Sequence, residues 1–188
     1  CVSDAELTRD EMLKIIFGIW DYIKNHGGQK EKAANYYLDW VSFVPAKRES
    51  RRIKGDYVLT ENDVLENRMF DDAIAYGGWH LDSHRPEGFY AFINDTPANG
   101  DKSVLFDGIY TIPYRCIFSA NVPNLLLGGR IISASHRAFS STRVMATCAV
   151  AAEAAGVAAA LAVKSRTDAK SVDVKLLQQI LLKNGCYI

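Results

Sequence analysis

The pattern of apolar and polar positions predicts helices at both ends of the chain. Met12, Ile15, Ile16 and Ile19 recur at the spacing of one helix face, which predicts a helix over residues 8–25. Shorter apolar runs with capping residues predict three more helices, over residues 30–41, 61–65 and 173–184. Thr60 and Asp63 have the spacing of a capping box before the second of these.

The middle of the chain carries runs of aromatic and β-branched residues that favour strands. We expect strands over residues 56–59, 73–80, 89–93, 104–106 and 108–118, with a turn or exposed loop over 94–102. A further buried strand is expected at Leu125–Leu127, in a short apolar run bounded by Pro123 and by two glycines. These elements together predict a mixed α/β fold.

An alanine-rich run follows this last strand and predicts one long helix over residues 141–163. Side chains this small permit close packing on a sheet, and they equally permit close approach of a flat cofactor. The polar stretch before the run therefore joins a strand end to a helix start, which is where α/β proteins commonly bind ligands.

Several residues of this polar stretch suit an anionic or carbonyl-rich ligand: Gly129, Arg130, Ser133, His136, Ser141, Arg143 and Thr147. Glycine at position 129 permits close approach of a ligand to the backbone. We expect Arg143 in the first helical turn, where the helix dipole disfavours a cation and a bound anion or carbonyl would compensate. Alternatively, Arg143 points to solvent or pairs with an acidic residue such as Glu153.

Four segments in the same order resemble the C-terminal end of a family of bacterial FAD-dependent oxidoreductases. They are RESRRIKGDYVLTENDV (48–64), DDAIAYGGWHLDSH (71–84), YTIPYRC (110–116) and GRIISASHRAFSSTRVMATC (129–148). The resemblance implies that the last strand, loop and helix hold the ribityl and isoalloxazine parts of FAD. It also implies a substrate-side region over residues 1–107 and the C-terminal portion of an FAD-binding domain over 108–188.

The chain departs from the family pattern at three places. Ser140 stands where the family usually has Gly, and Ala152-Glu153 stand where it usually has Gly-Gln. The chain also has no G-x-G-x-x-G after an early strand, the loop that binds the FAD pyrophosphate. We therefore expect the C-terminal part of a longer flavoenzyme, whose partner is a missing N-terminal Rossmann-type portion and which by itself binds FAD weakly or not at all.

The resemblance places Asp82 and His84 beside the substrate or the flavin ring, so they are candidate catalytic residues together with His136. A lone histidine in a loop has a structural role as its alternative. His80-x-Asp82-x-His84 could also present three metal-competent side chains on one face of a strand. A metal-dependent hydrolase and a non-catalytic interaction domain therefore remain alternative functions.

The composition of the chain limits the kinds of molecule that we expect it to bind. The formal net charge is zero and 48% of the residues are hydrophobic, so we expect a small-molecule substrate and no nucleic acid. The alanine-rich run is interrupted by Glu153 and followed by Lys164 and Arg166, so we expect no membrane span. The arginine-rich segment 48–52 fits either a solvated surface or the binding of a carboxylate substrate. The four cysteines are scattered and predict neither a disulfide framework nor a zinc site. The sequence does not assign the protein to a cellular compartment.

Overall fold

The computed structural model describes residues 4–44, 51–84 and 103–188. The chain forms two compact units, Cys1–Ser50 and Arg51–Ile188, which are described separately. The predicted strand 89–93, the loop 94–102 and residues 48–50 of the arginine-rich segment lie outside the described residues. The division expected near residue 107 concerns functional roles and stays a prediction.

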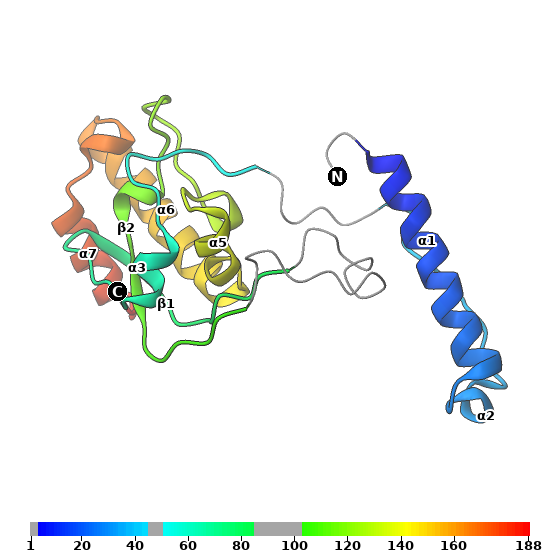
Figure 1. Ribbon diagram of the computed structural model, residues 1–188. Helices are drawn as coiled ribbons and strands as arrows, with labels where there is room; N and C mark the ends of the chain where they lie inside the picture. Colours follow the sequence, from blue (N-terminus) through cyan, green and yellow to red (C-terminus); the bar gives the residue numbers. More distant parts are fainter. Residues whose placement is uncertain (1–3, 45–50, 85–102) are drawn as a thin grey trace. The chain divides into compact units, whose positions relative to one another are not determined.

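The first unit is one long helix followed by a short one. Helix α1 (Ala5–Asp21) continues into the π-helical turn η1 (Tyr22–His26), and the short helix α2 (Lys30–Ala33) follows (Figure 1). The helix predicted over 8–25 is thus confirmed, with an earlier start and a π-helical end.

The helix predicted over 30–41 is wrong beyond Ala33. The ammonium group of Lys24 donates hydrogen bonds to the carbonyl oxygens of Ala33, Ala34 and Tyr36, at 2.9, 2.7 and 2.6 Å. These bonds satisfy carbonyl groups at the helix end, and the chain continues without regular structure, with Trp40 exposed.

The second unit is built around two antiparallel strands, β1 (Ala73–Gly77) and β2 (Tyr110–Pro113). Gly77 lies opposite Tyr110 and Ala75 opposite Ile112, with an irregularity between Ala73 and Ala75. Helices α6 (Met145–Ser165) and α7 (Val174–Lys183) both contact β1 (Figure 1). The core therefore lies between this small sheet and the two helices.

Local capping determines two shorter helices. Helix α3 (Glu61–Leu65) begins at a complete capping box of Thr60 and Asp63, and Asp173 caps α7 through a bond from the Leu176 amide. Both helices are as predicted, because each start depends on residues three positions apart in the sequence.

The long helix predicted over 141–163 is wrong, because two helices occupy this region. Helix α5 (His136–Thr142) begins where the Ser135 side chain accepts a hydrogen bond from the Ala138 amide. Val144 is extended, with φ −68° and ψ 150°, and α6 begins after it. Arg143 is therefore the C-cap of α5 and does not lie in the first turn of a long helix, and its cation is favourable at that end of the dipole.

The predicted strand at Leu125–Leu127 is reduced to a single bridge between Phe118 and Leu126. Residues 56–59 and 104–106 likewise form only the bridges Leu59–Ala134 and Leu81–Val104. Residues 108–118 contain β2 and then the 3₁₀ turn η2 (Tyr114–Cys116). The two remaining 3₁₀ turns are η3 (Gly129–Ile131) and η4 (Ala169–Ser171). The described part is a mixed helix and antiparallel-sheet structure, consistent with an α/β class.

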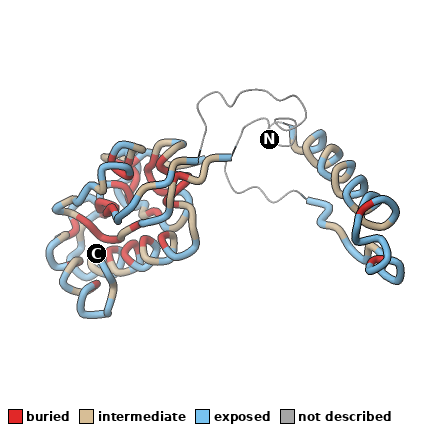
Figure 2. The backbone as a smooth tube through the Cα atoms, turned by 60° about the horizontal axis from the view of Figure 1, so that its bottom comes forward, coloured by how far each residue is buried: buried red, intermediate tan, exposed pale blue. Residues whose placement is uncertain are grey.

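Helix α6 buries one face and exposes the other. Its buried residues, which lie in the core of the second unit, are Thr147, Ala151, Ala154, Ala155 and Ala158 (Figure 2). By length and composition alone, α6 is the one helix of the described residues that could cross a membrane, and 28% of its apolar window is buried. Its buried face contacts β1, as in a core helix.

Candidate functional site

The segment that follows β1 lies against α5. Leu81 pairs with Val104 through two backbone hydrogen bonds of 3.0 Å. The Ser141 hydroxyl donates to the carbonyl oxygen of Trp79, and the Arg143 guanidinium donates to the carbonyl oxygen of Asp82 at 2.7 Å. The C-terminal half of α5 thus holds the segment that carries the predicted catalytic residues.

Three of the predicted site residues meet here. An oxygen of the Asp82 carboxylate lies 3.7 Å from Nη2 of Arg143 and 3.8 Å from Nε2 of His84. The side chains of Arg143, Asp82 and His84 are 9%, 38% and 54% exposed, so the group opens to the surface on the histidine side. A carboxylate between a guanidinium and an imidazole can orient the imidazole toward a bound molecule.

His136 lies at the other end of α5. It is the first residue of this helix and is exposed, whereas Ser141 and Arg143 lie at the C-terminal end. Its neighbour Ser135 donates to the Glu61 carboxylate at 3.1 Å, which joins α5 to α3.

The predicted cofactor residues fall into two groups. Gly129, with φ +76°, and Arg130 lie in η3, where Arg130 is exposed and an added side chain at Gly129 would meet no atom within 4 Å. Ser133, Ser141 and Thr147 are instead buried. Only the first group is open to a ligand in the described chain.

The buried serines have partners or neighbours inside the protein. Ser141 also contacts the Tyr110 hydroxyl at 2.7 Å. Ser133 lies beside Gly55, where an added Cβ would be 3.1 Å from the Ser133 Cβ and 2.4 Å from the Arg115 carbonyl oxygen. Among the described residues, the Ser133 hydroxyl has no hydrogen-bond partner.

The start of α6 is open to the surface. Val144, its N-cap, makes no side-chain capping bond, and Met145 is 89% exposed. Burial raises the pKa of the Cys148 thiol in this first turn, and the charge of Arg130 opposes that rise. Uncapped N–H groups and a neighbouring cation make this helix start electropositive.

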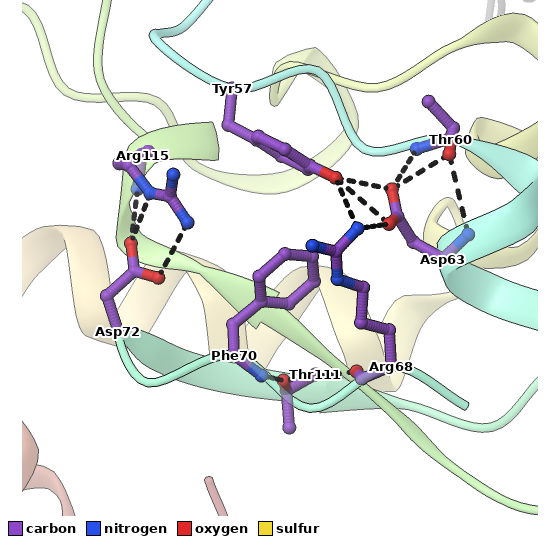
Figure 3. Close-up of polar contacts among 8 residues, drawn as sticks. All are labelled: Tyr57, Thr60, Asp63, Arg68, Phe70, Asp72, Thr111 and Arg115. Carbon is purple, nitrogen blue, oxygen red and sulfur yellow. Dashed lines mark hydrogen bonds and ion pairs between the residues drawn. The ribbon is translucent and has the colours of Figure 1, made fainter. Parts of the chain in front are cut away.

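A polar cluster not predicted as a site lies around Asp63 (Figure 3). The side chain of Asp63 is 3% exposed and accepts hydrogen bonds from the Tyr57 hydroxyl, from the Thr60 amide and hydroxyl, and from Arg68. The capping-box spacing of Thr60 and Asp63 was the sequence signal for this cluster. Tyr57 and Arg68 had no such signal, because they reach Asp63 only in the folded chain.

Aromatic rings and arginines surround this cluster. The Tyr57 and Phe70 rings pack edge to face at 5.2 Å, with the Arg68 guanidinium 4.8 Å from the Phe70 ring and that of Arg115 5.1 Å from the Tyr57 ring. Arg115 also pairs with Asp72 at 2.9 and 3.1 Å (Figure 3). Because these charged groups are paired with one another, the cluster stabilises the fold.

Hydrogen bonding determines the ionisation of Asp63. Burial by itself raises the pKa of this carboxyl, but the bonds from Thr60, Tyr57 and Arg68 outweigh it, so the pKa lies below its usual value. Asp63 is therefore ionised in the folded protein at neutral pH.

The described part of the arginine-rich segment also has a structural role. Arg52 donates from Nε to the Ala134 carbonyl oxygen at 3.0 Å, and its guanidinium lies 5.1 Å from the Phe139 ring. This contact joins the segment to α5.

A cavity of about 520 Å³ lies elsewhere, between η2 and the start of α7, with Tyr114, Phe118 and Val174 in its wall. None of the predicted site residues lines it. Within the ranges that the structure describes, no three histidine, cysteine or acidic side chains are grouped so as to hold a metal ion.

Comparison with known families gives one result. A family model described as FAD dependent oxidoreductase matches residues 2–181. The chain belongs to this family. No match was found among curated proteins or among solved structures. Membership of this family indicates an oxidoreductase that uses FAD and acts on a small-molecule substrate.

Proposed function

We propose that this chain contributes the flavin-ring side of the FAD site, and part of the substrate site, of a flavin-dependent oxidoreductase. The observation that carries the proposal is the family match, which extends over residues 2–181 of the 188. When bound, FAD would supply the hydride acceptor. The protein would supply orientation and a positive field.

The start of α6 is the best candidate for that field. Its first N–H groups lack a side-chain cap, and exposed Arg130 lies close enough to influence the Cys148 thiol in the first turn. Such a site stabilises the negative charge that develops on a flavin as it is reduced. Gly129 would let the flavin approach the backbone, because the space beside it is open.

The hydrogen bonding of the segment Leu125–Leu127 is an argument that a second portion of polypeptide completes this site. Its backbone bonds to another segment among the described residues are those from the Leu127 amide to the Ile117 carbonyl and from the Ser119 amide to the Leu125 carbonyl, while the Leu125 amide bonds locally to the Val122 carbonyl. Pairing with a strand of a nucleotide-binding portion would extend this apolar run into the strand that its sequence predicts. That portion would also supply the pyrophosphate loop that the chain lacks.

Titration of the purified chain with FAD, followed by flavin fluorescence, tests the two-part site. We expect weak or no binding by the chain alone and retention of FAD by a longer protein that includes a G-x-G-x-x-G portion. Tight stoichiometric binding by the chain alone would contradict the two-part site. A longer protein that is purified without flavin and takes up none would contradict the function.

Arg130→Met in the longer protein tests the proposed field. We expect a lower flavin reduction potential, because a cation near the reduced ring has been removed, and Lys164→Met at the far end of α6 is the control. An unchanged potential would remove Arg130 from the site.

A further inference from the structure

We propose that α5 is a positioning clamp for Asp82 and His84, in which Ser141 and Arg143 hold the backbone of residues 79–82 and do not contact the cofactor. That the clamp positions catalytic residues rests on the proposed function. The clamp itself is a property of the chain.

Arg143 forms the first anchor. Its side chain is 9% exposed, and a guanidinium this buried requires hydrogen-bond partners. One of these partners is the main-chain carbonyl oxygen of Asp82, at 2.7 Å. Because this acceptor is backbone, Arg143 positions the Asp82 residue itself, while an oxygen of the Asp82 carboxylate lies 3.7 Å from Arg143 and 3.8 Å from His84.

Ser141 forms the second anchor. Its hydroxyl has one proton, which it donates to the Trp79 carbonyl oxygen. In the 2.7 Å contact between the two hydroxyl groups, Tyr110 must therefore be the donor and Ser141 the acceptor. This relay connects the first residue of β2, through α5, to the segment that follows β1.

The packing of Tyr110 fixes its ring and keeps its hydroxyl protonated. Its ring lies over Gly77, where an added Cβ would come within 2.4 Å of the ring and of the hydroxyl oxygen. Burial raises the pKa of Tyr110 to about 12, so its hydroxyl keeps its proton at neutral pH. Tyr110 thus has a proton to donate, and the bond from Ser141 to Trp79 determines that Ser141 accepts it.

The two anchors act three residues apart on one short segment. Both donate to main-chain oxygens, those of Trp79 and Asp82, and the Leu81 pairing with Val104 lies between these two acceptors. The direction in which Asp82 and His84 leave the backbone is therefore determined by α5. This role also accounts for the burial of Ser141, which is 0% exposed and so cannot contact a flavin directly.

Amide hydrogen exchange and histidine NMR on the 188-residue chain test the clamp. Arg143→Met and Ser141→Ala should each speed exchange at Leu81 by about tenfold, the equivalent of about 1.4 kcal/mol for a lost hydrogen bond to a charged or buried group. Exchange at Leu181 in α7 should not change. The ring resonances of His84, assigned with His84→Gln, should shift, and Arg143→Lys should restore part of both effects.

Lys164→Met, which removes an exposed cation from the end of α6, is the control and should change neither reading. Wild-type exchange at Leu81 and wild-type His84 resonances in both Ser141→Ala and Arg143→Met would overturn the clamp. If Arg143→Met does not fold, the exchange rate at Leu81 and the His84 resonances in Ser141→Ala and Arg143→Lys test the clamp instead.

In the longer, flavin-containing protein, the clamp predicts that Arg143→Met keeps its FAD. Loss of FAD from this variant would make Arg143 a cofactor ligand and would overturn the proposal. Failure of the wild-type longer protein to bind FAD would contradict the proposed function alone, because the exchange and NMR readings need no flavin.

Discussion

Among the described residues, the carboxylate of Asp63 accepts more hydrogen bonds than any other carboxylate. Its bonds join the start of α3 to both Tyr57 and Arg68 (Figure 3). Replacing the carboxylate by an amide removes the charge and turns one acceptor oxygen into an NH2 donor, so some of these buried or half-buried donors lose their acceptor, which costs more than the bonds themselves contribute.

Asp63→Asn should therefore lower the free energy of unfolding by about 2–3 kcal/mol at pH 7. The folded pKa of Asp63 lies below its unfolded value, so its stabilisation is complete above about pH 4 and is lost as the pH falls through the folded pKa. Urea unfolding between pH 3 and pH 7 measures both effects.

The acid-induced loss of stability should be smaller in Asp63→Asn than in the wild type. Asp107→Asn, at an exposed position, is the matched control and should behave like the wild type at every pH. An equally steep acid loss in Asp63→Asn would show that other carboxyl groups cause it.

At the scale of elements, two glycines have opposite surroundings. Gly77 ends β1 directly under the Tyr110 ring, so it is the close approach of these two strands that requires a residue without a side chain. Gly156 lies in the middle of α6, and an added Cβ would meet no atom within 4 Å. The fold requires the first glycine and not the second.

Gly77→Ala should destabilise the protein by about 2–3 kcal/mol, because the new methyl group forces Tyr110 to move. Gly156→Ala should stabilise it by about 1 kcal/mol, since alanine has the higher helix propensity. Thermal and urea unfolding of the two variants give the comparison. A destabilised Gly156→Ala would mean that another surface packs against this face of α6 in solution.

At the scale of the whole molecule, the two units differ in how much apolar surface they bury. The core cluster lies entirely within the second unit, from Leu59 to Leu181. Of the described residues of the first unit, Gly27 and Ala33 are the ones that are buried, while Phe17, Tyr37 and Trp40 are exposed. Figure 2 accordingly shows much more red in the second unit than in the first. A helical unit with so little burial has small stability of its own.

Residues 51–188 should therefore fold without the first 50. We expect the urea midpoint of this shortened chain to equal that of the main transition of the full chain, and limited proteolysis of the full chain to cut the first unit first. A shortened chain without a cooperative transition would show that the first unit contributes to the core.

Local interactions made parts of this protein predictable from sequence. The starts of α3 and α7 depend on caps three residues away, and α1 depends on a helical repeat of apolar residues, so no distant contact was needed. The four motif segments similarly predicted the family, which the match over residues 2–181 confirms.

Tertiary contacts decided the rest. The break between α5 and α6 accompanies the bond from Arg143 to Asp82, 61 residues away. The burial of Ser141 follows from its contacts with Tyr110 and Trp79, which are 31 and 62 residues away. Leu125–Leu127 has an apolar strand sequence, yet within the described residues it forms a single bridge to Phe118, because a strand also needs neighbours to bond. Sequence patterns thus determined the elements whose interactions are local, whereas long-range hydrogen bonds determined which polar side chains of the candidate site stay open to a ligand.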